Sequence, residues 1–266
     1  MNIEEYWNTE LSKDIKEDIL NIRNEINGTI QRAYKYIGAA KLIHDNWSMY
    51  NRNALNNSKL SQLSEDLKNK IFTNHEIKDL GNERHLFVTA FVPDGIVTFI
   101  DDLCDDCEKI YVLNGGPGTG KTPLLKFIYT EALKRGFFVE VYHDALVPDK
   151  IEHIIIPELK TALISANEIN GKKFNGTQIY LENFIDYSLI NKLQLKKDKE
   201  MFYSLLNISL DIVSSTKKLY TSLETYCIQN INFNEPDEVS ANIANKLLKY
   251  EKDCLEKQGL SIRCQP

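Results

Sequence analysis

The stretch YVLNGGPGTGKTPLLKFI, residues 111–128, decides the fold. An apolar run passes into a cluster of glycines, then into Lys121 and Thr122, and then into an apolar pattern with helical spacing. The pattern G-x-x-x-x-G-K-[ST] between a strand and a helix is typical of a loop that binds phosphate groups. The sequence therefore predicts a nucleotide-binding loop. It consists of Gly115, Gly116, Pro117, Gly118, Thr119, Gly120, Lys121 and Thr122.

Each residue type in this loop suits a phosphate ligand. Glycines adopt backbone conformations closed to other residues, and they let backbone N–H groups approach phosphate oxygens. The helix that follows directs its positive end at the same anion. We expect Lys121 to contact the β- and γ-phosphates as the catalytic cation, and the Thr122 hydroxyl to ligate Mg²⁺. The predicted ligand is a nucleoside triphosphate, ATP, with Mg²⁺ as cofactor.

Composition restricts the function further. The 266 residues carry a formal net charge of −6, which argues against broad electrostatic capture of nucleic acid. The N-terminus lacks the pattern of a signal peptide, and no apolar run approaches the roughly 18 residues of a membrane span. Five cysteines, an odd number, do not suggest a disulfide framework. We therefore expect a cytoplasmic protein without a membrane partner.

Apolar segments around the loop predict the core. Strand-like runs occupy residues 85–91, 109–113, 137–143, 153–156 and 161–165, and a helical pattern covers 121–135. Strands that alternate with helices and are apolar on both faces are typical of parallel sheets. The prediction is an α/β fold, a three-layer P-loop NTPase core with a mainly parallel sheet over residues 79–180, flanked by long helices at both ends.

The flanking segments, 1–78 and 181–266, resemble one another. Helical apolar stripes at 15–37 and 201–223 are related by an offset of 186 residues, and several polar and aromatic residues follow the same offset. We interpret this as an internal duplication, in which the chain holds the tail of one unit and the whole of the next. The first stripe is expected to pack beside the second or to form a homodimer or protein interface. The matching pairs are Lys13/Lys199, Asp14/Glu200, Arg32/Lys218, Tyr34/Tyr220, Asn46/Asn232 and Trp47/Phe233.

Four stretches resemble a known family, the bacterial P-loop ATPase-like proteins built from two tandem copies of one α/β unit, most of which have no assigned role. They are RHLFVTAFVPDGIVTFIDDL (84–103), CEKIYVLNGGPGTGKT (107–122), GFFVEVYHDALVPDKIEHIIIPELKTALI (136–164) and AYKYIGAAKLIHDNW (33–47). The resemblance implies that a complete member carries a further P-loop unit upstream.

The chain departs from this family at one position of consequence. Ser165 stands where the resemblance implies an acidic residue that holds water on Mg²⁺, and its absence weakens hydrolysis more than binding. Glu158 matches the family and is the remaining candidate to orient metal or water, unless it is a capping or solvated loop residue. His143 is expected to be a structural hydrogen-bonding residue, and Asp144 could supply a carboxylate.

Three functions remain open after these observations. The first is a Mg-ATP-binding protein with weak or conditional ATPase activity, in which the nucleotide changes how the helical segments pack. The second is a nucleotide-sensing or degenerate interaction module without enzymatic activity, which Ser165 and the missing upstream unit favour. The third is a small-molecule P-loop kinase. Guanine selectivity is not indicated, because residues 191–194 begin the Asn-Lys-x-Asp motif but end in glutamine.

Overall fold

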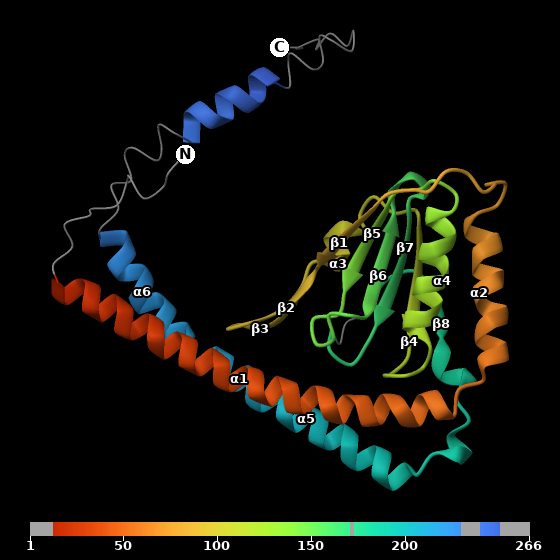
Figure 1. Ribbon diagram of the computed structural model, residues 1–266, viewed down its shortest axis with the longest axis horizontal. Coiled ribbons are helices and arrows are strands. Elements are labelled where there is room, and N and C mark those ends of the chain that lie inside the picture. Colours follow the sequence, from red (N-terminus) through yellow and green to blue (C-terminus); the bar gives the residue numbers. More distant parts are fainter. Residues whose placement is uncertain (1–12, 171–172, 230–239, 251–266) are drawn as a thin grey trace. The chain divides into compact units, whose positions relative to one another are not determined.

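The computed structural model describes residues 13–170, 173–229 and 240–250 (Figure 1). The chain divides into two compact units. One unit is Gly28–Lys217, which holds both β-sheets, and the other combines Met1–Asn27 with Lys218–Pro266. This division differs from the predicted boundaries at residues 78 and 180, because helices from both flanking segments pack onto the sheet unit.

A six-stranded sheet forms the centre of the Gly28–Lys217 unit, with the order β1-β5-β6-β7-β4-β8. The pairs β1–β5, β4–β7 and β4–β8 are parallel, whereas β6 is antiparallel to both of its neighbours. The fold is therefore α/β with a mixed, mainly parallel sheet. The strands are β1 (Glu83–Phe87), β4 (Lys109–Asn114), β5 (Val139–His143), β6 (Ile151–Ile156), β7 (Thr161–Ala166) and β8 (Thr177–Tyr180).

The direction of β6 corrects the expectation of parallel strands across residues 137–165. Only a 3₁₀ turn, Pro157–Leu159, and Lys160 at a φ of 44° connect β6 to β7. A parallel connection needs a crossover of a dozen or more residues, so this short link forms an antiparallel pair. Because β6 runs in the opposite direction, it begins at the edge of the sheet where β4 and β7 end.

Helices cover the two faces of the sheet unequally. On one face, α4 (Lys121–Leu133) packs against the sheet, and α2 (Asn57–Ile71) packs against α4 (Figure 1). The opposite face is covered by the short α3 (Ile100–Leu103) together with Val88 and Phe174. Along β4, β5 and β7, side chains alternate between the two faces, as the pleat requires. The three-layer prediction placed helices on both faces of the sheet. On this second face, the covering layer consists mainly of the short α3 and loop residues.

Helices α1 (Lys13–Asn53) and α5 (Lys192–Ser215) pack together in the Gly28–Lys217 unit. The rings of Trp47 and Phe202 lie 6.1 Å apart between centroids, and the Ser209 hydroxyl donates to the Ala33 carbonyl at 3.2 Å. Within this unit, the C-terminal part of the first apolar stripe, around Ala33 and Ile37, lies beside α5. The same cluster includes residues of the loops after β5 and β7, so α1 lies at the edge of the sheet where β4 ends.

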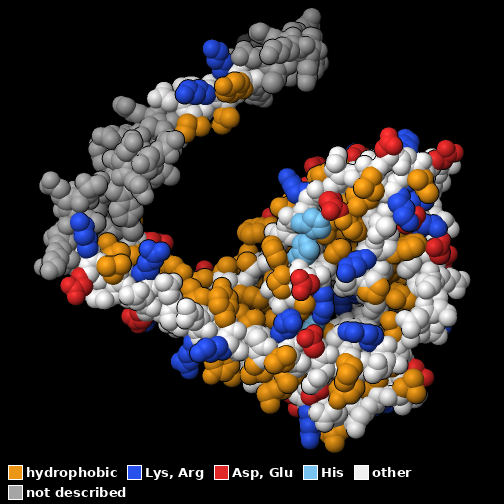
Figure 2. All heavy atoms as spheres, in the orientation of Figure 1, with side chains coloured by type: hydrophobic (Ala, Val, Ile, Leu, Met, Phe, Trp, Pro, Cys, Tyr) orange, Lys and Arg blue, Asp and Glu red, His pale blue; other side chains and the backbone are white. Residues whose placement is uncertain are grey.

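A hairpin and a further helix are joined to α5. The hairpin of β2 (Thr89–Val92) and β3 (Gly95–Thr98) packs on α5. Helix α6 (Lys217–Gln229) follows α5 after a break at Thr216. Helix α1 has no break 186 residues earlier, at the position that the proposed duplication pairs with Thr216. Two of the paired positions, 232 and 233, lie outside the described residues. Every helix among the described residues is too short or too polar to cross a lipid bilayer. Figure 2 shows acidic and basic side chains interspersed among apolar ones on the face drawn.

Candidate functional site

The glycine-rich loop, residues 115–122, connects β4 to α4 as predicted. Gly120 has a φ of 98° and directly precedes the first residue of α4. A Cβ at Gly120 would lie 2.6 Å from Leu60 Cδ2 of α2, so glycine serves both the backbone angle and the close packing here. The Thr119 hydroxyl donates to the Gly116 carbonyl at 2.9 Å and fixes the turn from within.

Helix α1 holds the loop from the other side. The buried Asn51 amide donates to the Pro117 carbonyl at 2.6 Å. A Cβ at Gly118, whose φ is 75°, would collide with the Ser48 carbonyl, so the two backbones are in direct contact at this point. The sequence pattern contains no signal for this contact, because the residues that meet are more than 60 positions apart in the chain.

Lys121 begins α4, and its ammonium group lies inside the loop. Its Nζ donates to the Gly115 carbonyl and, at 2.9 Å, to the Gly116 carbonyl. Burial lowers the pKa of Lys121, and the charges of Glu168 and Asp144 oppose that shift only in part. The start of a helix favours a nearby anion, and binding one there would exchange the two carbonyl partners of Lys121 Nζ for oxygens of the anion.

A pocket of about 420 Å³ opens beside the loop. Three carboxylates converge on it, and two cationic side chains besides Lys121, namely Arg52 and Lys150, also line it. The mixture of both charges around a concave site is typical of binding sites for polar ligands. The carboxylates are Asp144 after β5, Glu152 at the start of β6 and Glu168 after β7.

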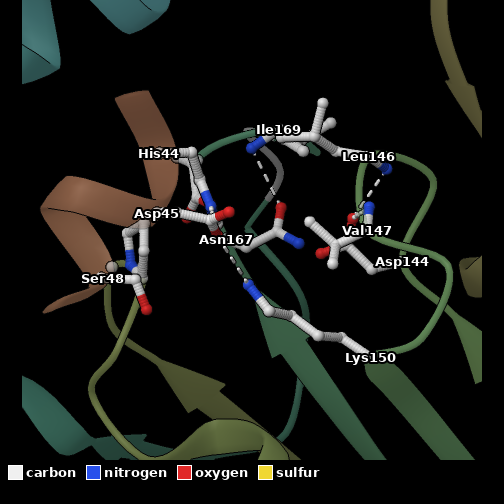
Figure 3. Close-up of polar contacts among 12 residues, drawn as sticks. His44, Asp45, Ser48, Asp144, Leu146, Val147, Lys150, Asn167 and Ile169 are labelled. Carbon is white, nitrogen blue, oxygen red and sulfur yellow. Dashed lines mark hydrogen bonds and ion pairs between the residues drawn. The ribbon is translucent and has the colours of Figure 1, made fainter. Parts of the chain in front are cut away.

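Asp144 is fixed by the turn that follows β5. Its Oδ1 accepts the backbone N–H groups of Leu146 at 2.7 Å and Val147 at 2.9 Å (Figure 3). Burial raises the pKa of Asp144, and the neighbouring Glu152 raises it further. The preceding residue, His143, does not line the pocket, because its ring is hydrogen-bonded to His85 at 2.8 Å and to the Pro148 carbonyl at 2.6 Å. His143 thus has the structural role that was expected.

The loop after β7 brings Glu168 into the pocket. Asn167 shapes this loop, because its Oδ1 accepts the N–H groups of Ile169 (Figure 3) and Asn170, and its Nδ2 donates to Glu152 Oε1 at 2.6 Å. His44 of α1 donates from Nε2 to Glu168 Oε1 at 2.6 Å. Glu168, Glu152 and His44 were not among the predicted site residues.

Ser165 and Glu158 occupy very different places. Ser165 is buried and lines the pocket, where its backbone N–H donates to His153 Nδ1 at 3.1 Å. Glu158 lies in the turn between β6 and β7, at the edge of the sheet opposite the glycine-rich loop, and accepts the Phe138 N–H at 3.1 Å. Its expected role in orienting metal or water does not fit this position.

The residues that line the pocket determine how Mg²⁺ could be held there. Among the described residues, no group of three or more His, Cys, Asp or Glu side chains is arranged to hold a metal ion by itself. Mg²⁺ at nucleotide sites usually takes one or two protein ligands and completes its shell with phosphates and water. Thr122 and a neighbouring pocket carboxylate would supply such a partial set.

Comparisons of the chain with models of known protein families, with curated proteins and with solved structures found no match. The resemblance to tandem-repeat P-loop ATPase-like proteins therefore stays a prediction, and the function is argued from the site.

Proposed function

We propose that the Gly28–Lys217 unit binds the Mg²⁺ complex of a nucleoside triphosphate, ATP, and hydrolyses it slowly or conditionally. The observation that carries this proposal is the placement of Lys121 and Thr122 at the start of α4, facing a pocket that the glycine-rich loop lines. Backbone N–H groups, the helix terminus and Lys121 would bind the phosphates. Mg²⁺, held by Thr122 and shared with the phosphates, would neutralise charge on them.

The first experiment is a calorimetric titration of Mg-ATP into the unmutated chain and into Lys121→Ala, with phosphate release measured on the same samples. Loss of a hydrogen bond to a charged group is expected to weaken binding about 10- to 100-fold. Lys126→Ala is the matched control, because Lys126 is exposed on the same helix and does not line the pocket. Equal affinity in Lys121→Ala and the unmutated chain, or no binding at all, would contradict the proposal.

A nucleotide sensor without turnover is the second candidate. Two observations favour it: Ser165 stands where a carboxylate was expected, and α1 contacts the loop through Asn51. A change of loop conformation on binding would therefore reach α1 directly. Binding without phosphate release would identify a sensor. Phosphate transfer to an added hydroxyl compound, in place of release to water, would identify a kinase.

A further inference from the structure

The carboxylate of Glu168 is held in the pocket by its surroundings. Its side chain is only 5% exposed, although it comes from a loop. Oε1 is bound by His44 Nε2 at 2.6 Å, whereas the buried Oε2 has no hydrogen-bond partner among the described residues. A buried carboxylate oxygen without a donor is costly, so an unpaired one that lines a pocket indicates a ligand or a reacting water.

His44 comes from a distant part of the chain, 124 residues before Glu168. The imidazole is itself buried, and it lies against the ring of Phe202 with centroids 5.5 Å apart. Its orientation is therefore fixed by packing as well as by the hydrogen bond. A rigid donor on one oxygen leaves the other oxygen of Glu168 in a defined position.

The pKa values of two pocket carboxylates, Glu168 and Asp144, are shifted in opposite directions. Burial raises the pKa of Glu168, but the hydrogen bond from His44 and the charge of Lys121 outweigh burial and hold that pKa below the usual value. Asp144 has its pKa raised by burial and by Glu152. Glu168 is thus ionised at neutral pH and can accept a proton. The Oδ1 of Asp144 is already bound by two backbone N–H groups.

We propose that Glu168 is the catalytic base that activates water, and that His44 is the positioning residue that orients it. This inference rests on the proposed function. In this proposal, Glu168 takes the role of the acidic residue that was expected at position 165, where the chain has Ser165. His44 lies on α1, so α1 helps to orient the base.

The step is a hydrolysis. The water oxygen forms a bond to the γ-phosphorus while the bond between that phosphorus and the β–γ bridging oxygen breaks. The water proton passes to Glu168 Oε2, and the electron pair of the broken bond stays on the bridging oxygen of the nucleoside diphosphate. Lys121 would stabilise the charge that develops there, and Glu168 returns its proton to phosphate or solvent.

The test uses the full chain with saturating Mg-ATP, and it measures nucleotide Kd and kcat separately. Glu168→Gln keeps an oxygen that can accept from His44 but cannot serve as a base. It is expected to lower kcat about 100-fold or more and to leave Kd within about threefold. Glu158→Gln tests the rival carboxylate and is expected to keep the unmutated rate, because Glu158 lies at the opposite edge of the sheet.

Two substitutions of His44 separate positioning from folding. His44→Leu removes the donor and is expected to lower kcat about 10- to 100-fold at unchanged Kd. His44→Gln keeps a side-chain N–H and is expected to recover a large part of the rate. A merely structural histidine would give similar losses in both variants, together with a lower unfolding temperature.

Several results would overturn the inference. Binding of Mg-ATP by the unmutated chain without phosphate release would leave the binding proposal intact but would remove the role of Glu168 as a base. An unchanged kcat in Glu168→Gln would also show that Glu168 is not the base, and it would leave the binding proposal intact. A Glu168→Gln defect that disappears at high Mg²⁺ concentration would assign Glu168 to the metal instead. Absence of nucleotide binding by the unmutated chain would remove the proposed function and this inference together.

Discussion

Asp144 shows how one side chain in the pocket is shaped by competing effects. Two backbone N–H groups stabilise its carboxylate, but burial and the nearby Glu152 disfavour the negative charge and raise its pKa. A group whose pKa is raised on folding contributes stability below its unfolded pKa, and that contribution is lost as pH rises through the folded pKa. The ionised Asp144 therefore costs stability at neutral and alkaline pH.

We predict that Asp144→Asn raises the urea midpoint of unfolding at pH 8 and has a much smaller effect near pH 4. The asparagine oxygen can still accept the N–H groups of Leu146 and Val147, but it never carries the charge. Circular dichroism at the two pH values provides the measurement. Asp149→Asn, an exposed change in the same turn, is the control. At each pH, the midpoint of Asp144→Asn is compared with that of the unmutated chain. A rise at pH 8 that is no larger than the rise at pH 4 would refute this account.

Residue-level prediction from the sequence was strongest where one local pattern fixes the course of the backbone. Residues 115–122 form one loop at the start of α4, as their spacing predicted. Glu168 was missed because it lies three positions beyond Ser165, on a turn that the hydrogen bonds of Asn167 create. Glu158 was chosen because it matches the family, but the direction of β6 carries it to the opposite edge of the sheet.

At the scale of elements, the contact between α1 and the glycine-rich loop is the feature that organises the site. The backbone of Gly118 touches the carbonyl of Ser48, and Asn51 donates to Pro117. A side chain at Gly118 must therefore move the helix or the loop.

We predict that Gly118→Ala destabilises the protein by about 1–3 kcal/mol, because the residue sits at positive φ, with a further cost from the collision. Nucleotide binding should weaken at the same time. Gly38→Ala is the matched control, since a Cβ there meets nothing within 4 Å and alanine favours the helix by up to roughly 1 kcal/mol. Chemical denaturation and Mg-ATP titration of both variants would decide. Equal stability of the two variants would contradict the direct contact.

Element types were easier to predict than their pairing. The helix predicted over residues 121–135 is α4, Lys121–Leu133, and the strand predicted at 109–113 is β4. The antiparallel course of β6 was not predicted, because an apolar run such as 153–156 has the same composition in either direction. The short link between β6 and β7 indicates an antiparallel pair, but the alternation of strands and helices elsewhere in the core suggested a parallel one.

At the scale of the whole molecule, binding of a ligand should be visible as a change in stability. A ligand at 100 times its Kd adds about 2.7 kcal/mol to the free energy of unfolding when only the folded state binds it. For a domain of this size, such a gain corresponds to a rise of roughly 5–10 °C in the midpoint of thermal unfolding.

We therefore predict that saturating Mg-ATP raises the Tm of the unmutated chain by about that amount, and that the Tm of Lys121→Ala changes little. Differential scanning calorimetry measures both. ATP without Mg²⁺ serves as a further comparison, since a shared cation is expected to strengthen phosphate binding. A rise of the same size in Lys121→Ala would place the bound nucleotide elsewhere on the protein.

The domain organisation was the least predictable level. The sequence patterns suggested a helical segment at 1–78, a core at 79–180 and a second helical segment at 181–266, whereas contacts in the structure group Gly28–Lys217 into one unit. Periodicity identifies the apolar face of a helix but not the partner that covers it. The burial of Trp47 against Phe202 depends on a contact across 155 positions of the chain, and local patterns do not encode it.

The arrangement of the sheet also has a consequence for the order of folding. Strands β5, β6 and β7 follow one another in the chain and pair as neighbours, so they can assemble through short closures. The link between His44 and Glu168 closes a separation of 124 residues. A refolding chain is thus expected to form the central strands before α1 docks. The pocket is then expected to be completed late, so a nucleotide bound as proposed would stabilise the finished protein without guiding its early assembly.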